Sequence, residues 1–557
     1  MGISNVLHKL ELPRPAAALH TKAYVNEDTV PLPPHRRTYG PWSFIGLWVV
    51  TGSFNIGGWT TGSSLIALGL NVWQSMLTVI IGNTMVGIIC VMTGYPGAKW
   101  HVGFPILQKA HWGVFGGIFP LVNRIILSFI WYSTQIWWGG ETLKCFIEAL
   151  WPSFRSLNKE LAKGTMTTGD FTCFIIFSVL CLPLIRIPPE KFQRPFAVAA
   201  ITVIPTVFIL LIWCCARAGG GGALLSDVTV AGVEQVKGST LGWTLVYGIM
   251  SNVGSISTHI FSQSDFTRFA KKPSDQFLAQ ILFVPLSTMV VALIGIVCTS
   301  CATKLYPEES LLWEPFSLLS AIQKYANDSS RSRAAVAFAS LAFIFSQFGI
   351  AVAENALSNG IDLSGLLPRW FNLKRGGYLT AAFAFIMQPW SLLNGATKFL
   401  TVIGGYAVFL GPFTGILFSD FYLVRKRQLK LTDLYDISDQ SIYWYTKGIN
   451  FRAPVAWIMG VWPLLPGFVK FVQEGAVDMT SNWSKVYCLC WLLGCLISSF
   501  VYYVLCYFFP VSGLGLIDDG DYFGTFGDEY VVDTEGSVTT VQKQGDVVVE
   551  KVISGET

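Results

Sequence analysis

Between Leu127 and Gly140 the sequence reads LSFIWYSTQIWWGG, and one polar amide, Gln135, lies inside this apolar, aromatic run. Trp131 precedes Gln135 by four positions, so on a helix both side chains point from the same face, about one turn apart. The carboxamide offers one acceptor and two donors, and the indole offers a flat stacking face. The pair therefore fits a planar molecule with an amide or imide edge. It fits equally well a polar contact between two membrane helices.

The composition places this chain among membrane proteins. Of its 557 residues, 52% are hydrophobic and only 13% are charged, and the mean hydropathy is +0.51. A soluble domain carries a charged fraction of about a quarter, so we expect an all-α polytopic membrane protein. The twelve cysteines lie almost entirely inside apolar runs. There they are typical of small buried residues and not of a disulfide framework.

Apolar runs long enough to cross a bilayer recur along the chain. A crossing of about 30 Å of hydrocarbon needs about 20 residues in a helix, and the runs predict about twelve transmembrane helices. The predicted spans are 41–70, 74–97, 116–149, 171–187, 196–216, 241–263, 277–301, 332–358, 377–394, 398–423, 451–471 and 484–509.

The Lys and Arg residues of the short loops gather on one side of the predicted membrane, which places both termini in the cytosol. Residues 1–40 are basic, lack the apolar core of a signal peptide and predict a cytosolic tail. Two glycosylation motifs, at Asn327 and Asn482, fall in loops predicted to be outside. Residues 510–557 are acidic and predict a disordered cytosolic tail without a packed core. We expect such tails either to bind regulatory partners or to stay solvated.

Two predicted helices carry a cluster of Gly, Ser and Asn at mid-span, Ser53–Gly58 in the first helix and Ser251–Ser257 in the sixth. Such clusters weaken a helix, and unwound backbone at membrane depth is tolerated only where it is buried in protein or lines a cavity. Paired interruptions five helices apart indicate an inverted-repeat transporter with its site at the midplane. The alternative is a pair of close helix crossings made by small residues.

A five-plus-five inverted repeat with two further C-terminal helices divides the chain into three parts. The assigned ranges are 41–216, 241–423 and 451–509. In this arrangement the third helix, which carries Gln135, corresponds to the eighth, which carries Glu354 and Asn355 inside an apolar run. A second amide then faces the first across the core of the bundle.

Over roughly residues 40–510 the sequence resembles the first nucleobase:cation symporter family, and within it the fungal uracil, uridine and allantoin permease branch. Several short motifs carry this resemblance jointly. They are Phe54-Asn55-Ile56, Asn71-Val72-Trp73-Gln74, Trp131-Tyr132-Ser133 with Gln135, Ser264-Asp265-Phe266-Thr267-Arg268-Phe269, Asn355 with Asp362-Leu363, Lys374-Arg375-Gly376, and Ser419-Asp420-Phe421-Tyr422 with Arg425.

The resemblance implies a LeuT-like fold in which a helical bundle rocks against a scaffold. It implies Trp131 for stacking on the substrate and Gln135 and Asn355 for contacts with its amide edge. Phe54 and Asn55, at the interruption of the first helix, complete the expected substrate-binding set. The residues that the resemblance assigns to the substrate are those that the spacing in the sequence indicates.

Three departures from the family pattern bear on function. Ile256 stands where bacterial hydantoin carriers of the family have a second tryptophan, so we expect stacking on one face only. Gly349 and Ile350 stand at positions whose hydroxyls bind sodium in those carriers, and neither offers a side-chain oxygen. Ala351 replaces an asparagine, and Glu354 replaces a small residue found in many relatives.

Ionisable residues inside a membrane are costly and are candidates for function. Glu354, beside the amide of the eighth helix, is the leading candidate for the coupled proton, with His259 and Asp362 as alternatives. Asp265 and Arg268 lie three positions apart near the cytosolic end of the sixth helix and predict a structural or gating ion pair.

These observations favour a plasma-membrane importer of a planar nucleobase-type heterocycle, driven by protons and without a metal, cofactor or nucleic-acid partner. The six histidines are scattered and supply no metal cluster or catalytic triad, so we do not expect an enzyme. The alternatives are a thiamine or nicotinamide riboside transporter, for which Glu354 would supply the anion, and a nutrient-sensing receptor of the same fold.

Overall fold

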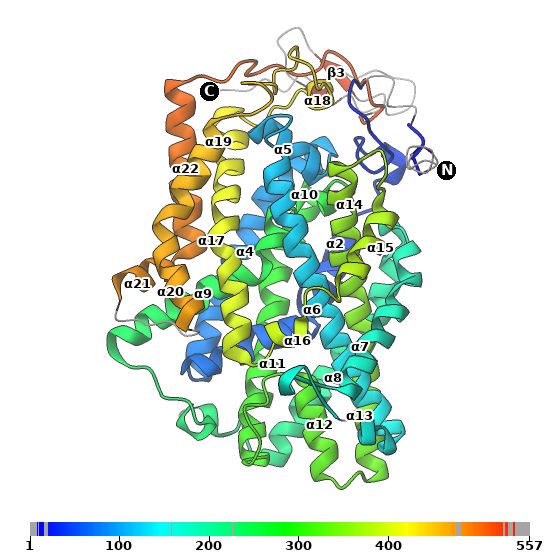
Figure 1. Ribbon diagram of the computed structural model, residues 1–557, viewed down its shortest axis with the longest axis vertical. Helices are drawn as coiled ribbons and strands as arrows, with labels where there is room; N and C mark the ends of the chain where they lie inside the picture. Colours follow the sequence, from blue (N-terminus) through cyan, green and yellow to red (C-terminus); the bar gives the residue numbers. More distant parts are fainter. Residues whose placement is uncertain are drawn as a thin grey trace.

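Long helices, most of them running along one axis, make up the computed structural model (Figure 1). The structure describes residues 8, 10–15, 21–157, 159–225, 228–474, 481–526, 530–532 and 538–540. The helical membrane architecture that the sequence predicts is confirmed. The boundaries proposed between the two halves of the repeat stay a prediction.

The α-helices of the first half of the chain that the argument uses run from α2 to α10. They are α2 (Pro41–Leu47), α3 (Ile56–Ser63), α4 (Val72–Trp100), α5 (Phe104–Trp112), α6 (Ile118–Leu150), α7 (Thr168–Cys181), α8 (Gln193–Ala218) and α9 (Gly238–Phe261), followed by the short α10 (Ser264–Thr267).

The second half supplies the remaining helices among the described residues. They are α11 (Val284–Leu305), α12 (Pro315–Tyr325), α13 (Ser330–Gly349), α14 (Leu357–Leu366), α15 (Leu373–Phe383), α16 (Pro389–Leu392), α17 (Ala396–Phe418), α18 (Leu431–Leu434), α19 (Arg452–Val461), α20 (Leu465–Glu474), α21 (Asn482–Cys488) and α22 (Cys490–Phe508).

Four π-helical segments and two small hairpins complete the regular structure that the argument uses. The π-helices are η3 (Trp48–Ser53), η12 (Ala279–Phe283), η13 (Ile350–Ala356) and η14 (Ser419–Val424). The strands are β1 (Glu160–Leu161), paired antiparallel with β2 (Met166–Thr167), and β3 (Tyr530–Val532), paired antiparallel with β4 (Val538–Thr540). Single π-helical turns are frequent at functional sites, and two of these four segments line the cavity described below.

Eight helical stretches in the described part of the chain are long and apolar enough to cross a membrane. They are Val72–Trp100, Thr168–Arg186, Gln193–Ala218, Pro273–Leu305, Ser330–Leu366, Ala396–Val424, Arg452–Gln473 and Cys490–Phe508. Two further predicted spans, 116–149 and 241–263, correspond to α6 and α9, whose lengths of 33 and 24 residues suffice. Their hydropathy falls short because they carry the polar and aromatic residues of the site.

The remaining two of the twelve predicted spans, 41–70 and 377–394, are not single helices. Span 41–70 is divided at Phe54 and Asn55, as the sequence predicts. Span 377–394 was expected as one helix, and the structure corrects this to α15 and the four-residue α16. Between them Gln388 adopts a left-handed backbone conformation with φ of 47° and precedes Pro389. A proline disfavours helical geometry at the residue before it, which explains the interruption.

The interruption of the first helix is a helix end followed by a new, capped helix start. The π-helix η3 ends at Ser53, Asn55 takes an extended conformation with φ of −147°, and α3 begins at Ile56. The Asn55 side-chain oxygen accepts from the Gly58 backbone N–H at 2.9 Å, which is the interaction of a helix N-cap. The predicted break of the first membrane helix is confirmed.

The predicted interruption of the sixth helix is wrong, because α9 is continuous through Ser251–Ser257. Asn252 donates to the Gly248 carbonyl at 2.7 Å, so its amide bonds back onto its own helix. Gly82 of α4 lies against this segment, where an added Cβ would be 2.7 Å from the Asn252 Cβ. The small residues therefore serve a close helix crossing, which the sequence had left open as the alternative.

The chain segments before α2 and after α22 lie at the same end of the bundle, beside α5 and α18 (Figure 1). Asn26 is buried there and donates to Ser364 Oγ at 2.9 Å and to the Phe371 carbonyl at 2.8 Å. Asp518 accepts from the backbone N–H of Leu431 at 2.7 Å. Buried hydrogen bonds thus attach the first segment to α14 and the second to α18.

The prediction of a disordered C-terminal tail without a packed core is wrong for residues 511–526. The Phe523 ring is buried, with its centroid 5.0 Å from that of Tyr435, and Phe526 lies edge-on to Trp100 at 6.1 Å. Aromatic residues among the acids supply apolar area that the charge count of the tail conceals. The rest of the tail, β3 and β4 apart, lies outside the described residues.

All twelve cysteines are free thiols, and eleven of them are buried while Cys215 is half-buried. The interpretation of these residues as small apolar packing residues is confirmed.

Candidate functional site

A cavity of about 60 Å³ lies where the broken first helix meets α6, α9 and η13. It is lined by Trp48, Thr51, Gly52, Asn55, Gly57, Gly58, Thr61, Trp131, Gln135, Trp138, Ser255, Ile256, His259, Thr288, Ile350, Glu354, Asn355 and Phe399. Its walls combine aromatic rings with a few polar groups, which is the usual make-up of a small-molecule site.

Trp131, Gln135 and Asn355, which the sequence selects as substrate residues, all line this cavity. Trp131 and Gln135 lie one turn apart on α6, as their spacing predicts, and Asn355 comes from η13 on the facing element. The indole is half-buried, while the two amide side chains are only 3% and 4% exposed. A planar ligand in the cavity can therefore meet one stacking face and two amides.

The two amides are held in defined orientations by the element that contains α13 and η13. Gln347 of α13 donates from Nε2 to the side-chain oxygen of Gln135 at 2.5 Å and to its backbone carbonyl at 2.9 Å. Asn355 donates from Nδ2 to the Ile350 carbonyl at 2.9 Å. One polar atom of each site amide is thus already bonded within the protein.

The two leading candidates for proton coupling form a pair. His259 Nε2 of α9 lies 3.4 Å from Glu354 Oε2 of η13, and both residues line the cavity. The sequence analysis treats them as alternatives, whereas the structure brings them into contact. A carboxyl group and an imidazole can each gain and lose a proton, so the pair places exchangeable protons in the wall of the cavity.

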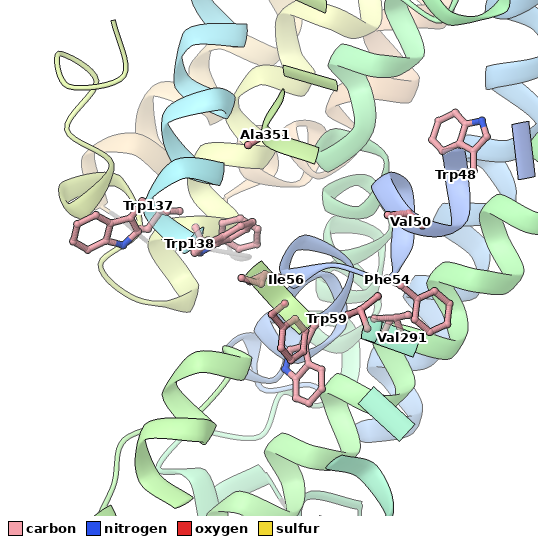
Figure 2. Packing of buried hydrophobic residues seen from close by; sticks show 14 of the residues in the cluster. Trp48, Val50, Phe54, Ile56, Trp59, Trp137, Trp138, Val291 and Ala351 are labelled. Atoms are coloured by element: carbon pink, nitrogen blue, oxygen red, sulfur yellow. The ribbon is translucent and has the colours of Figure 1, made fainter. Parts of the chain in front are cut away.

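Phe54 and Asn55 differ from their predicted roles. The Phe54 side chain does not line the cavity and lies beside Val291 in the packing against α11 (Figure 2). Near the break its backbone is engaged, since its carbonyl accepts from Ser346 Oγ at 2.6 Å and its N–H donates to the Val49 carbonyl at 2.8 Å. Phe54 is therefore a packing residue in this structure.

Asn55 lines the cavity, but its polar atoms are engaged with the backbone. In addition to capping α3, its Nδ2 donates to the carbonyls of Thr51 at 2.6 Å and Val50 at 3.2 Å. Its side chain thereby joins the end of η3 to the start of α3. This interaction gives Asn55 the role of fixing the break in place.

The predicted Asp265–Arg268 ion pair is replaced by a different pairing. Arg124 of α6, 2% exposed, lies 3.3 Å from Asp265 and also pairs with Asp362 of α14. Arg268 instead donates to the Asp28 carbonyl at 2.7 Å. Arg124 reaches both carboxylates because it comes from a third helix, a relation that sequence spacing along a single helix does not reveal.

This charged cluster ties α6 to two other elements at a distance from the cavity lining. Arg124 also donates to Ser358 Oγ at 2.5 Å, and Asp265 accepts from the Phe104 backbone N–H at 2.8 Å. None of Arg124, Asp265 and Asp362 lines the cavity. Their arrangement is that of a buried structural or gating network.

The hydroxyl groups near the break bond to one another. Ser53 Oγ lies 2.7 Å from Ser287 Oγ and 2.9 Å from Thr288 Oγ1, which joins η3 to α11. Gly349 and Ile350, at the start of η13, supply no side-chain oxygen. Ile256 lines the cavity in place of a second tryptophan.

The sequence analysis missed four residues of or around the site: Gln347, Arg124, Trp48 and Trp138. Gln347 and Arg124 are polar side chains inside predicted apolar spans, so the rule that singled out Glu354 applies to them as well. The two tryptophans carry no such signal, because tryptophan is frequent throughout this chain.

An aromatic cavity with convergent amides, inside a helical bundle whose first helix is broken at membrane depth, defines the site of a membrane permease. The chain belongs to the family described as permeases for cytosine/purines, uracil, thiamine and allantoin, whose profile matches residues 31–494. It is therefore an integral, multi-pass membrane permease for a small molecule, of a family of transporters and not of enzymes.

Relatives and a solved structure agree with this membership. The chain is 32% identical to the uracil permease of Saccharomyces cerevisiae, over 88% of this chain and 76% of that protein. It is 30% identical to a thiamine transporter of the same yeast, over 95% and 86% of the two chains. The closed conformation of Mhp1, a nucleobase-cation-symport-1 family transporter with bromovinylhydantoin bound, shares the fold with a TM-score of 0.67 at 19% identity, covering 88% of this chain and 97% of Mhp1.

Proposed function

We propose that this protein imports a planar, neutral heterocycle of the uracil, uridine or allantoin class across the plasma membrane by proton symport. The observation that carries the proposal is the convergence of Trp131, Gln135 and Asn355 on one cavity beside the His259–Glu354 pair. The ring would stack on Trp131, and its carbonyl and N–H groups would bond to the two amides.

The contacts of the amides support a ligand with an amide-type edge. Loss of one buried partner leaves the other polar group unpaired, at a cost of about 1–3 kcal/mol, or about tenfold to a hundredfold in affinity. We expect Gln135→Ala and Asn355→Ala to lose this affinity while still reaching the cell surface. Unchanged apparent affinity in either variant would mean that the substrate binds elsewhere.

Proton coupling is supported by the chemistry of the residues at hand. A sodium site requires several oxygen ligands at short range, and Gly349 and Ile350 contribute none from their side chains. Glu354 and His259 lie on two different elements, η13 and α9. Gain or loss of a proton in this pair would change the attraction between these elements, and this provides a link between protonation and alternating access.

The coupling test is uptake measured against pH and against sodium. We expect a protonophore to abolish accumulation and replacement of sodium by choline to leave it intact, while the opposite pattern would refute proton coupling. We expect Glu354→Gln to lose the pH dependence of uptake. Normal accumulation and normal pH dependence in this variant would clear Glu354 and direct attention to His259 and Asp362.

A second candidate is a cationic substrate such as thiamine or nicotinamide riboside, because Glu354 could serve as a counter-ion in the cavity. Relatives described as a thiamine transporter and as a nicotinamide riboside transporter are 30% and 29% identical to this chain. The contact between Glu354 and His259 favours the neutral heterocycle, since the carboxyl group already has a partner. Competition among uracil, uridine, allantoin, thiamine and nicotinamide riboside in liposomes distinguishes the two and also tests the receptor alternative.

The proposed orientation places both termini in the cytosol. The segment around Asn327 lies at the opposite end of the bundle from α5 and α18, which supports this orientation (Figure 1). Cysteine-accessibility labelling that found residue 327 or 482 on the cytosolic side would overturn it.

A further inference from the structure

Gln347 is a buried glutamine whose side chain bonds to a residue of the cavity wall. It lies on α13, is fully buried and does not line the cavity, yet both hydrogen bonds of its side chain go to Gln135. Its own side-chain oxygen is buried without a hydrogen-bond partner. An unpaired buried carbonyl is destabilising, so fold stability alone gives little reason for a glutamine here.

The bonds from Gln347 fix which way the Gln135 carboxamide faces. Gln347 Nε2 is a donor only, so it takes the Gln135 oxygen and leaves the Gln135 Nε2 group as the free end. Among the described residues this Nε2 has no protein acceptor, and it is not a fully buried atom. The free end of Gln135 is therefore a donor that reaches the cavity.

The second amide of the cavity, Asn355, is held by its nitrogen, so its oxygen is the free end. The bond that holds it lies within η13. The Asn355 Nδ2 group donates to the Ile350 carbonyl, five residues earlier, as the wider turn of η13 allows. Its Oδ1 atom accepts from no donor in the described part of the chain and, like the Gln135 Nε2, is not fully buried. The cavity thus presents one donor from α6 and one acceptor from η13.

We propose that Gln347 is a positioning residue that sets the polarity of the substrate site, so that Gln135 donates to a carbonyl of the substrate while Asn355 accepts from its neighbouring N–H. The matching ligand class is a ring with a lactam, imide or ureide edge. This inference rests on the proposed function, because it assumes that Gln135 and Asn355 contact the substrate.

The alternative role for Gln347 is to join α13 to α6 without any effect on the substrate. The neighbouring residue on α13, Ser346, makes such a joint by donating to the Phe54 carbonyl. The two roles differ in one measurable respect. A positioning residue acts through the Gln135 carboxamide, so its effect on substrate affinity must vanish when that carboxamide is absent.

A double-mutant cycle on the full-length purified protein tests this directly. The variants are Gln347→Met, which keeps the length of the side chain and removes its donors, Gln135→Ala, and the two combined. The measured quantity is the Kd for radiolabelled uracil, or for the member of the five-compound panel that the wild-type protein takes up. Each variant is first checked for monodispersity and for its thermal unfolding midpoint.

We expect Gln347→Met to raise Kd about tenfold, since a freely rotating carboxamide no longer presents its donor. In the Gln135→Ala background we expect the same substitution to change Kd by less than about twofold. An unchanged Kd in the single variant, or an equal rise in both backgrounds, would overturn the assignment of Gln347. An unchanged Kd in Gln135→Ala would instead overturn the proposed substrate site.

Two further variants keep the test decisive if Gln347→Met is poorly folded. Gln347→Asn retains an amide but is shorter by one methylene, so it withdraws the donor from Gln135, and we expect Kd to rise again. Gln323→Met is the matched control, because Gln323 is a buried glutamine of α12 that donates to the Glu148 carbonyl at 3.1 Å, away from the cavity. We expect it to change thermal stability and leave Kd unaltered, and a rise in Kd in this control would show that the effect is not specific to Gln347.

Discussion

The break at Phe54–Asn55 and the continuous segment Ser251–Ser257 have nearly the same composition but opposite structures. In the first, Asn55 bonds forward to the Gly58 N–H and back to the Thr51 carbonyl, so its side chain spans a gap between two helices. In the second, Asn252 bonds back to the Gly248 carbonyl, which is already part of its own helix. A Gly, Ser and Asn cluster is thus compatible with either outcome.

The difference lies in what each segment packs against. The break borders the cavity and is held by hydroxyl contacts to α11, as expected for unwound backbone at membrane depth. The continuous segment crosses α4 closely, with Gly82 against Asn252 and Gly248 against Thr78. Composition therefore identifies where a helix can open, and packing decides whether it does.

The largest expected effect is a loss of stability on substitution of Arg124, whose ion pairs hold the chain where α9 ends. After α9 the chain turns into α10, where Asp265 is held by Arg124. Arg124→Met leaves two buried carboxyl groups without their cation, and we expect a loss of about 3–5 kcal/mol in the free energy of unfolding. The measurement is thermal unfolding in detergent together with surface abundance, with Arg124→Lys as a control that retains the charge. Wild-type stability in Arg124→Met would show that the end of α9 does not depend on this cluster.

A second prediction contrasts the two asparagines. Asn55→Ala removes a helix cap and the donors to two carbonyls at the break, and we expect a loss of about 2–3 kcal/mol and at least about tenfold lower uptake per surface molecule. Asn252→Ala removes a bond inside an intact helix, and we expect about 1 kcal/mol and near-normal uptake. Equal effects of the two substitutions on uptake would mean that the break has no special role.

A third prediction tests the close crossing of α4 and α9. In Gly82→Ala the new Cβ would lie 2.7 Å from the Asn252 Cβ and 3.0 Å from the Ile249 carbonyl, so the helices must separate. We expect a loss of about 2 kcal/mol in the free energy of unfolding. Gly46→Ala is the control, because nothing lies within 4 Å of a Cβ built there. If both variants keep the wild-type unfolding midpoint, α9 can move away from α4 at little cost and the crossing is not tightly packed.

The smallest expected effect is a pH dependence of stability at the end of α10. His101 Nδ1 donates to the Arg268 carbonyl at 2.9 Å, and burial, aided by the nearby Arg37 charge, lowers the pKa of His101 to about 4. In the unfolded chain the pKa of a histidine is about 6.5, so between about pH 6.5 and 4 His101 binds a proton in the unfolded chain but not in the folded one. The free energy of unfolding therefore falls as the pH drops through this range. Down to about pH 5.5 we expect a loss of about 1 kcal/mol.

The check is the thermal unfolding midpoint at pH 7 and at about pH 5.5 in the wild-type protein and in His101→Gln. The variant should lose less stability on acidification than the wild-type protein. The same loss in both proteins would place the acid sensitivity on another group.

Much of the site could be predicted from the sequence, because its members either share one helix face or stand out as polar groups in apolar runs. Trp131 and Gln135 illustrate the first case and Glu354 and Asn355 the second, and all four line the cavity. Contacts between helices could not be predicted from spacing. Arg124 was overlooked, and its pairing with Asp265 replaces the expected pair on a single helix.

The fold could be predicted at the level of a helical membrane bundle, and less well at the level of where its helices are continuous. Span 377–394 failed because apolar composition does not exclude a proline-bounded interruption, here at Gln388. The segment 511–526 failed because charge counts do not register the burial of Phe523. In both cases a local arrangement overrode an average property of the sequence.

The π-helix η13 gives the eighth predicted helix a wider turn, which holds about one residue more than a turn of α-helix. Each residue of an α-helix advances about 100° around the axis. If the same residues, Ile350–Ala356, formed a regular α-helix, everything beyond them would be rotated by about that angle relative to α13. Asn355 would then leave the wall of the cavity while Gln347 kept its place, so Gln135 and Asn355 owe their alignment across the cavity to the wider turn of η13.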